Sequence, residues 1–331
     1  MDRSKFIQSS SWIRVLEKRL FSHQFFLRLA DAPSLKDALR MLNDTIYQTS
    51  ISKLEKDTDY EKALSQELLR FYKEMYEISP SNIPIDFTVV KYYYHNLKVM
   101  AKEYVKKEDL SHLYVPLGNL DIFGLRKLLQ ENTSAKNEYL REVKETIRLY
   151  EKTKRPSDID IHLDRCYFKS LLKLADEADE DIFYSYVKDT IDFKNIRSLM
   201  RANAEGADLE FLTDILIDGG NIYKDNFYNY LNTKIEPDSK LFKYSNIYKY
   251  VKQGTEFFGK GRSLSRFELL VDNEMVDLIK DAKKITYGPE VIFAHVIAKE
   301  IELRNLRIIF VAKQNGLSSE FIRERLRDTY V

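Results

Sequence analysis

The sequence has few of the residues that interrupt regular structure or cross-link it. Ten glycines and seven prolines in 331 residues are less than half of average usage, which is about 12%. Sheet proteins need these residues for their many turns, so their scarcity excludes a sheet-rich fold and favours long helices. The single cysteine, Cys166, excludes an internal disulfide and is typical of a reducing cytosol. We interpret it as a small buried side chain.

An excess of one charge and long apolar runs are also lacking. The 53 basic and 52 acidic residues nearly cancel, so no nucleic-acid partner is expected. The longest apolar block, residues 308–312, is far shorter than the roughly 20 residues that span a bilayer. Residues 1–18 carry charges throughout, unlike a signal peptide. With 44% hydrophobic residues, the chain is predicted to be globular and able to visit a membrane surface without crossing it.

Apolar residues recur at helical spacing along most of the chain, which predicts an all-α fold. Prolines and capping residues divide the pattern into separate helices. The predicted helices cover residues 5–29, 35–47, 56–76, 86–104, 134–150, 156–174, 180–202, 241–258, 263–282, 289–313 and 318–328, with short helices after the turns at 117–120 and 219–222.

The helix predicted over residues 289–313 carries an amide on its apolar stripe. Asn305 shares one helix face with apolar residues such as Ala298, Ile301 and Ala312, at spacings of three and four. A buried amide without hydrogen bonds costs about 1–3 kcal/mol. We therefore expect the Asn305 side chain to bond to a neighbouring backbone.

An asparagine of this kind occurs three times, each followed two positions later by a cation. The pairs are Asn96 with Lys98, Asn195 with Arg197, and Asn305 with Arg307. An acid stands three positions before the asparagine in two copies, as Asp192 and Glu302, whereas the first copy has Tyr93. Residues five apart lie about 140° apart on a helix, so Glu302 and Arg307 are expected to bond to different neighbours.

Two further motifs recur in the same order. The turn at 118–120, Gly-Asn-Leu, is echoed by Gly-Asn-Ile at 220–222, and Asp164 is echoed by Asp272. In the first third of the chain Ser65 stands where the aspartate is expected. We interpret the chain as three helical repeats over residues 1–115, 116–215 and 216–331, a period far longer than that of solenoid repeats. Units of this size more naturally close around a common axis than stack in a line.

Asp164 and Asp272 are the predicted polar core residues. Our hypothesis pairs Asp164 with Arg197 and Asp272 with Arg307, within their repeats. Asp192 and Glu302 are alternative partners for the two arginines, and separate surface charges of little energetic weight are the competing interpretation.

Other polar groups are interpreted as structural. His162 and Cys166 share a helix face but are too few ligands for a metal site. Residues 259–263, Gly-Lys-Gly-Arg-Ser, lack the spacing and the preceding strand of a phosphate-binding loop. The acidic run at 176–181 suits a helix start. No nucleophile has a local base, so neither a catalytic site nor a cofactor is expected.

The C-terminal part carries a family resemblance. The matching segments read ELRNLRII at 302–309, KQNGL at 313–317 and IRERL at 322–326, before Tyr330 and Val331, and LNDTIY at 42–47 adds a match near the N-terminus. These segments resemble the C subunit of the prokaryotic V-type (A/V-type) ATPases, a family similar to the d subunit of eukaryotic V-ATPases. The resemblance extends over the whole length and is strongest over residues 287–331.

The resemblance implies an all-α, funnel-shaped protein of three similar lobes around a pseudo-threefold axis. It implies a non-catalytic adaptor of the central rotor on the cytoplasmic face of the membrane, peripheral to the membrane through its partners. These would be the rotor shaft, made of the D and F subunits, and the proteolipid rotor ring, so that ATP turnover drives transport of H⁺ or Na⁺. Tyr93 and Ser65 depart from the repeated pattern. A helical repeat scaffold for other proteins is the main alternative, and a helical enzyme is the second.

Overall fold

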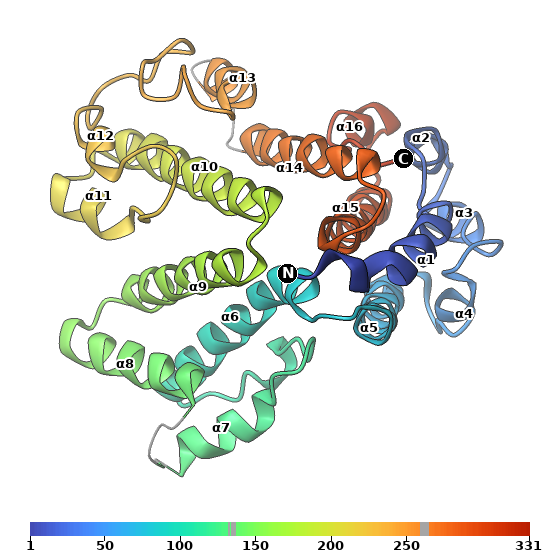
Figure 1. Cartoon of the computed structure of the whole chain (residues 1–331), viewed down its shortest axis with the longest axis horizontal. Helices are drawn as coiled ribbons and strands as arrows, with labels where there is room; N and C mark the ends of the chain where they lie inside the picture. Colours follow the sequence, from blue (N-terminus) through green and yellow to red (C-terminus); the bar gives the residue numbers. More distant parts are fainter. Residues whose placement is uncertain (132, 134–136, 259–264) are drawn as a thin grey trace. The chain divides into compact units, whose positions relative to one another are not determined.

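The computed structural model describes residues 1–131, 133, 137–258 and 265–331. Over these residues the backbone forms α-helices, short 3-10 turns (η) and loops, without a β-strand (Figure 1). The predicted all-α fold is therefore confirmed. Within the described part of the chain, no helix is both long and apolar enough to span a bilayer.

The chain divides into two compact units. Unit 1 consists of Met1–Ile85, Asp181–Tyr186 and Ile235–Val331, and unit 2 consists of Asp86–Glu180 and Val187–Lys234. The elements of unit 1 are η1 (Arg3–Phe6), α1 (Ile7–Glu17), α2 (His23–Asp31), α3 (Leu35–Arg40), α4 (Gln48–Ile51), η2 (Asp57–Asp59), α5 (Tyr60–Ile78), α13 (Tyr248–Phe258), α14 (Ser265–Lys280), η4 (Asp281–Lys284), α15 (Pro289–Gln314) and α16 (Ser319–Arg323).

Two long helices of unit 2, α6 and α10, have their first residues in unit 1. Its elements are α6 (Ile83–Lys106), η3 (Ser111–Leu113), α7 (Ile122–Gln130), α8 (Glu138–Thr153), α9 (Ser157–Ala178), α10 (Asp181–Glu205), α11 (Leu209–Ile215) and α12 (Lys224–Tyr228). Helices α8 and α9 pack against each other, and α7 packs against α8.

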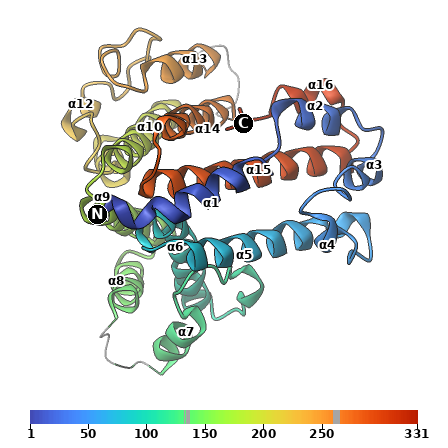
Figure 2. The same cartoon turned by 45° about the vertical axis from the view of Figure 1, so that its right-hand side comes forward.

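The core of unit 1 forms around α15. This helix is buried on nearly all sides, from Pro289 to Ala312. It contacts α1, α2, α3, α5, α14 and α16, and Figure 2 shows α1 running across the front of it. A helix that is apolar all round has to be enclosed by other helices. The polar residues on α15 therefore need partners inside the unit.

One predicted helix is divided in the structure and another is shorter than predicted. Residues 5–29 form α1 and α2, because the Ser22 hydroxyl accepts a hydrogen bond from the Phe25 backbone N–H and starts a second helix. The helix predicted over residues 35–47 ends at Arg40, since the Thr45 hydroxyl bonds to backbone groups on both sides and holds a turn. Helix α11 is not among the predicted helices.

Candidate functional site

The three repeated asparagines are buried and make the same contact. Asn96 is 1% exposed, and Asn195 and Asn305 are fully buried. In each case the side-chain Oδ1 accepts a hydrogen bond from a backbone N–H and the Nδ2 donates to the carbonyl of the same residue. The pairs are Asn96 with Val115, Asn195 with Ile217, and Asn305 with Arg327. We call each pair an asparagine clasp.

The clasp satisfies both polar ends of a buried amide. Its N···O distances range from 2.7 Å to 3.1 Å, which is normal hydrogen-bond length. The partner residue lies 19 to 22 positions downstream, so each clasp ties the segment that follows the next turn or helix back onto the long helix. The expectation that Asn305 bonds to a neighbouring backbone is confirmed, and Asn96 and Asn195 do the same.

The residue three positions before each asparagine accepts a second backbone hydrogen bond. Tyr93 Oη accepts from the Asn119 N–H (2.7 Å), Asp192 accepts from the Asn221 and Ile222 N–H groups (3.2 and 3.1 Å), and Glu302 Oε2 accepts from the Phe21 N–H (2.7 Å). A tyrosine oxygen accepts a hydrogen bond as a carboxylate does. The departure at Tyr93 therefore keeps this contact.

The recurring glycines in the turns follow from the same contact. A Cβ added to Gly118 would lie 2.3 Å from Tyr93 Oη, and one added to Gly220 would lie 2.1 Å from Asp192 Oδ1. Both distances are far below van der Waals contact. Only glycine lets the turn approach the acceptor so closely, which explains why Gly-Asn recurs at 118 and 220.

The third copy is assembled from two of the three stretches of chain that form unit 1. Asn305 bonds to Arg327, whereas Glu302 bonds to Phe21, 281 positions earlier. In the first two copies both contacts are made by one continuous loop. The third copy thus joins the segment after α15 and the segment before α2 to the same helix.

Glu302 belongs to a buried network of charges. Its Oε1 accepts hydrogen bonds from Tyr47 Oη and Lys299 Nζ, both at 2.7 Å. Lys299 lies 3.2 Å from Glu67, which in turn binds Arg70 through both carboxylate oxygens. Lys299 and Glu67 are each 1% exposed. Burial raises the pKa of Tyr47 well above its ordinary value, and the adjacent Glu302 adds to the effect, so the tyrosine donates its proton.

Among the described residues, no lysine or arginine forms an ion pair with Asp192. The neighbouring acid Asp189 is also buried and accepts a hydrogen bond from Asn221 Nδ2 at 2.9 Å. Burial raises the pKa of Asp189 to about 6. Burial, and next the nearby negative charge of Asp189, raise the pKa of Asp192 to about 7, while its hydrogen bonds to Ile222 and Asn221 oppose the shift. This copy therefore titrates near neutral pH.

The predicted ion pairs of the two repeated aspartates are wrong. Asp164 pairs with Lys98 and Lys194, and not with Arg197, while Asp272 pairs with Arg304 and Arg327, and not with Arg307. Arg307 instead binds Glu61 on α5. Lys194 and Arg304 directly precede the repeated asparagines. The residue directly before the asparagine lies about 100° around the helix from it, whereas Arg197 and Arg307 lie about 160° from it. Lys194 and Arg304 therefore face the helix that carries the aspartate.

Lys299, Glu67 and Tyr47 were not predicted from the sequence. The signal for Lys299 is its place in an apolar helix, three positions before Glu302. A buried lysine needs a carboxylate within reach, and spacing by three supplies one. Glu67 and Tyr47 give no such signal, because they lie on other helices or turns far away in the sequence.

Two other residues that the sequence singles out, Cys166 and His162, are half-buried. Burial raises the pKa of the Cys166 thiol to about 12, so it stays protonated. Burial lowers the pKa of His162. The described residues include no group of three or more histidine, cysteine or acidic side chains placed to hold a metal ion. Residues 259–263 lie outside the described part of the chain.

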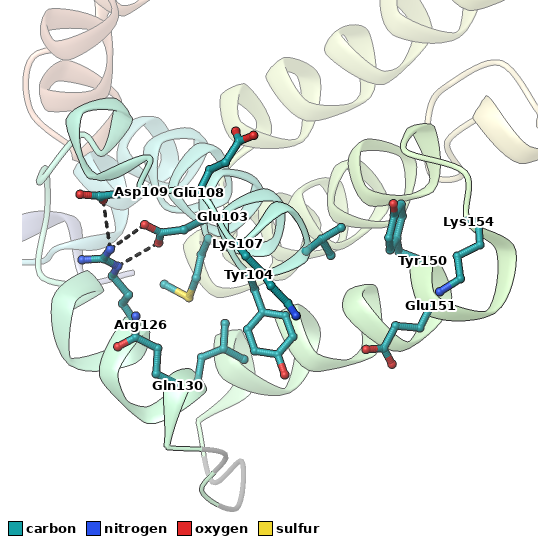
Figure 3. A pocket seen from close by; sticks show the side chains of 13 residues that line it. Glu103, Tyr104, Lys107, Glu108, Asp109, Arg126, Gln130, Tyr150, Glu151 and Lys154 are labelled. Atoms are coloured by element: carbon teal, nitrogen blue, oxygen red, sulfur yellow. Dashed lines mark hydrogen bonds and ion pairs between the residues drawn. The ribbon is translucent and has the colours of Figure 1, made fainter.

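Unit 2 contains a pocket of about 740 Å³ between the ends of α6 and α8 and helix α7 (Figure 3). Arg126 enters it from α7 and binds Glu103 at 2.6 Å and Asp109 at 3.2 Å. Tyr114 donates a further hydrogen bond to Glu103 at 2.8 Å. The described lining residues include acids, lysines and tyrosines but no histidine, serine or cysteine.

Comparisons with known proteins agree with the resemblance seen in the sequence. The chain is similar to the C subunit of the V-type sodium ATPase of Enterococcus hirae, with 26% identity over 96% of this chain and 97% of the relative. It is similar to the C subunit of the A-type ATP synthase of Methanocaldococcus jannaschii, with 24% identity over 98% of this chain and 87% of the relative. A family model described as ATP synthase (C/AC39) subunit matches residues 10–325. The chain therefore belongs to the ATP synthase (C/AC39) subunit family.

Proposed function

We propose that this protein is the non-catalytic adaptor of the central rotor in a V-type ATPase. It binds the D and F subunits of the shaft on one side and the proteolipid ring on the other, at the cytoplasmic face of the membrane. In this role it passes torque between the ATP-hydrolysing head and the ion-carrying ring. The observation that carries the proposal is the family match over residues 10–325, since relatives in that family are named as C subunits of V-type and A-type complexes.

The contacts inside the chain suit a part that has to resist twisting. Each asparagine clasp fixes an irregular segment to a long helix with two hydrogen bonds. Helix α15 has 26 residues and would extend about 39 Å at ~1.5 Å per residue. A loop that is hydrogen-bonded at fixed points deforms less under force than a loop that is held by apolar contacts alone.

We further propose that the clasps mark the three predicted repeats, 1–115, 116–215 and 216–331. Lys98 binds Asp164, which belongs to the next predicted repeat, and Arg307 of the third predicted repeat binds Glu61 of the first. By contrast, Asp164 with Lys194 and Asp272 with Arg304 are pairs within one predicted repeat. In the third copy the two cations beside Asn305 thus have separate roles, since Arg304 binds within its predicted repeat and Arg307 binds another predicted repeat.

The test is reconstitution. The purified chain is mixed with the D–F shaft and with a detergent-solubilised proteolipid ring, and complexes are separated by size-exclusion chromatography. We expect one complex that contains all components, and ATP-driven ion uptake that returns when the chain is added to complexes lacking it. Binding to neither shaft nor ring would overturn the proposal and favour the alternative, a helical scaffold for other proteins.

A further inference from the structure

Helix α1 buries one face in unit 1 and presents an apolar face outward. Ile7, Trp12 and Val15 are 51%, 50% and 49% exposed, respectively. The opposite face, which includes Ile13 and Leu16, is buried where the helix packs on α15 (Figure 2). Three large apolar side chains that are half exposed on one short helix form a patch of the kind that marks a contact surface.

The exposed side of α1 and the turn that follows it carry positive charge and no acid. At 100° per residue the exposed residues of the helix fall within one arc of about 140°. They are Ile7, Gln8, Ser11, Trp12 and Val15, and together with the exposed Lys18 and Arg19 directly after the helix they form what we call the α1 outer face. Neither Lys18 nor Arg19 makes an ion pair with a residue that the structure describes. Both cations therefore remain available to an outside partner.

Acids at the border of this face are bound to groups of the chain itself. Glu17 pairs with Arg14 at 2.7 Å and accepts a hydrogen bond from Tyr330 at 3.0 Å. Glu290 pairs with Arg3 at 2.6 Å. These pairs cancel the nearby negative charges, so the α1 outer face keeps the positive potential of Lys18 and Arg19.

This combination matches the boundary zone of a bilayer. Tryptophan and aliphatic side chains favour the depth of the lipid headgroups, and lysine and arginine are attracted to anionic headgroups. Polar Gln8 and Ser11 lie between the apolar residues, which suits a wet interface better than a dry protein contact. The attraction between the α1 outer face and anionic headgroups is moderate, because only the two unpaired cations of this face contribute.

We propose that the α1 outer face contacts an anionic lipid surface. The inference rests on the proposed function, because a rotor adaptor works beside a membrane. The lipid contact holds the N-terminal helix of the chain against the headgroups. It acts in addition to the contacts that the chain makes with its protein partners.

The fluorescence of Trp12 tests this directly, since it is the only tryptophan of the chain. The full-length protein is titrated with vesicles that contain phosphatidylglycerol and with vesicles of pure phosphatidylcholine. We expect a blue shift of Trp12 emission and co-sedimentation with the anionic vesicles, both weakened by added salt. The double variant Lys18→Gln/Arg19→Gln should lower the partition coefficient by roughly tenfold or more, from about 1 kcal/mol for each cation.

A matched control removes two cations elsewhere in unit 1. Lys36 and Lys53 are exposed and lie on other segments, so Lys36→Gln/Lys53→Gln should bind anionic vesicles as the unchanged protein does. Circular dichroism verifies that both double variants are folded. The proposal is overturned if anionic vesicles leave the Trp12 emission unchanged, or if the control loses as much binding as the α1 variant.

A parallel titration separates this proposal from the proposed function. A detergent-solubilised ring and the D–F shaft replace the vesicles in the same fluorescence assay. If Trp12 responds to the ring or shaft but not to vesicles, the lipid contact is wrong and the rotor role stands. If the chain binds anionic vesicles but neither protein, the rotor role fails while the lipid contact stands.

Discussion

A single amide has a large role in this protein, because each clasp asparagine satisfies two backbone groups outside the regular helices. Its Oδ1 and Nδ2 replace the partners that a buried N–H and C=O would otherwise lack. Leaving one such group unsatisfied costs about 1–3 kcal/mol. The clasp therefore stabilises the fold mainly because it avoids the cost of unsatisfied backbone groups, and less because of the free energy of the hydrogen bonds themselves.

We predict that Asn305→Ala lowers the free energy of unfolding by about 2–4 kcal/mol, because Arg327 loses partners for both its N–H and its carbonyl. Urea denaturation followed by circular dichroism measures the change. Asn43→Ala removes the same atoms from an exposed position and should change the value by less than about 0.5 kcal/mol. Equal effects at the two sites would contradict this account of the clasp.

The pair Asp189 and Asp192 predicts a pH dependence. Their folded pKa values, about 6 and about 7, lie above the ordinary value of about 3.9. Between about pH 4 and pH 7 the folded protein then binds more protons than the unfolded chain, so these groups make stability fall as the pH rises. Asp189→Asn keeps the oxygen that accepts from Asn221 but cannot ionise. We expect it to raise the free energy of unfolding above pH 7 by about 1–3 kcal/mol, and by much less near pH 4.

Denaturation at a series of pH values measures the difference between the Asp189→Asn variant and the unchanged protein. Asp44 is exposed on unit 1, and Asp44→Asn serves as the control with an identical change of charge. A difference that stays constant from pH 4 to pH 8 would rule out the assigned shift of Asp189.

At the scale of the element, α15 is a buried helix that carries ionised groups. Lys299 compensates Glu302 and Glu67 at the point where α15, α5 and the turn before α4 meet. A buried ion pair stabilises a protein little more than apolar residues of the same size do. Removing one member of the pair, however, leaves an uncompensated buried charge. The network therefore fixes which helices can pack on α15 more than it adds stability.

We predict that Lys299→Met destabilises the protein by about 3–5 kcal/mol, since Glu302 and Glu67 lose their shared cation. Adding Glu302→Gln should recover part of this loss, because glutamine still accepts from Phe21 N–H without a charge. Melting temperatures of the two single variants and the double variant give the coupling. Strictly additive losses would refute a compensated network.

Sequence reasoning predicted that Asn305 bonds to a neighbouring backbone and that its motif recurs at Asn96 and Asn195, but it did not predict the surroundings of the clasps. A polar residue on an apolar stripe has to be bonded, so the spacing alone reveals Asn305. The predicted cations Arg197 and Arg307 lie three positions after Lys194 and Arg304, which bind Asp164 and Asp272. This prediction was wrong because periodicity fixes an angle but not which neighbour a flexible side chain reaches. Phe21 could not be predicted as the partner of Glu302, since nothing in the local sequence marks so distant a contact.

For the whole molecule, the proposed role as a rotor adaptor requires that the protein resist twisting. If the clasps limit twisting, a variant that still folds should transmit torque less completely. We predict that complexes reconstituted with Asn195→Ala keep ATP hydrolysis but transport fewer ions for each ATP, because Ile217 is no longer held to α10. Paired assays of phosphate release and ion uptake measure this ratio. An unchanged ratio, with Asn43→Ala as the reference variant, would show that clasp stiffness does not limit coupling.

The third clasp also bears on how the protein is made. Phe21 emerges early from the ribosome, but its acceptor Glu302 is added only 281 residues later. Until then the segments before and after α2 lack the helix on which they pack, so their apolar faces stay open in the nascent chain. Unit 1 can thus reach its native packing only late in synthesis, and the cell has to protect its first part from aggregation in the meantime.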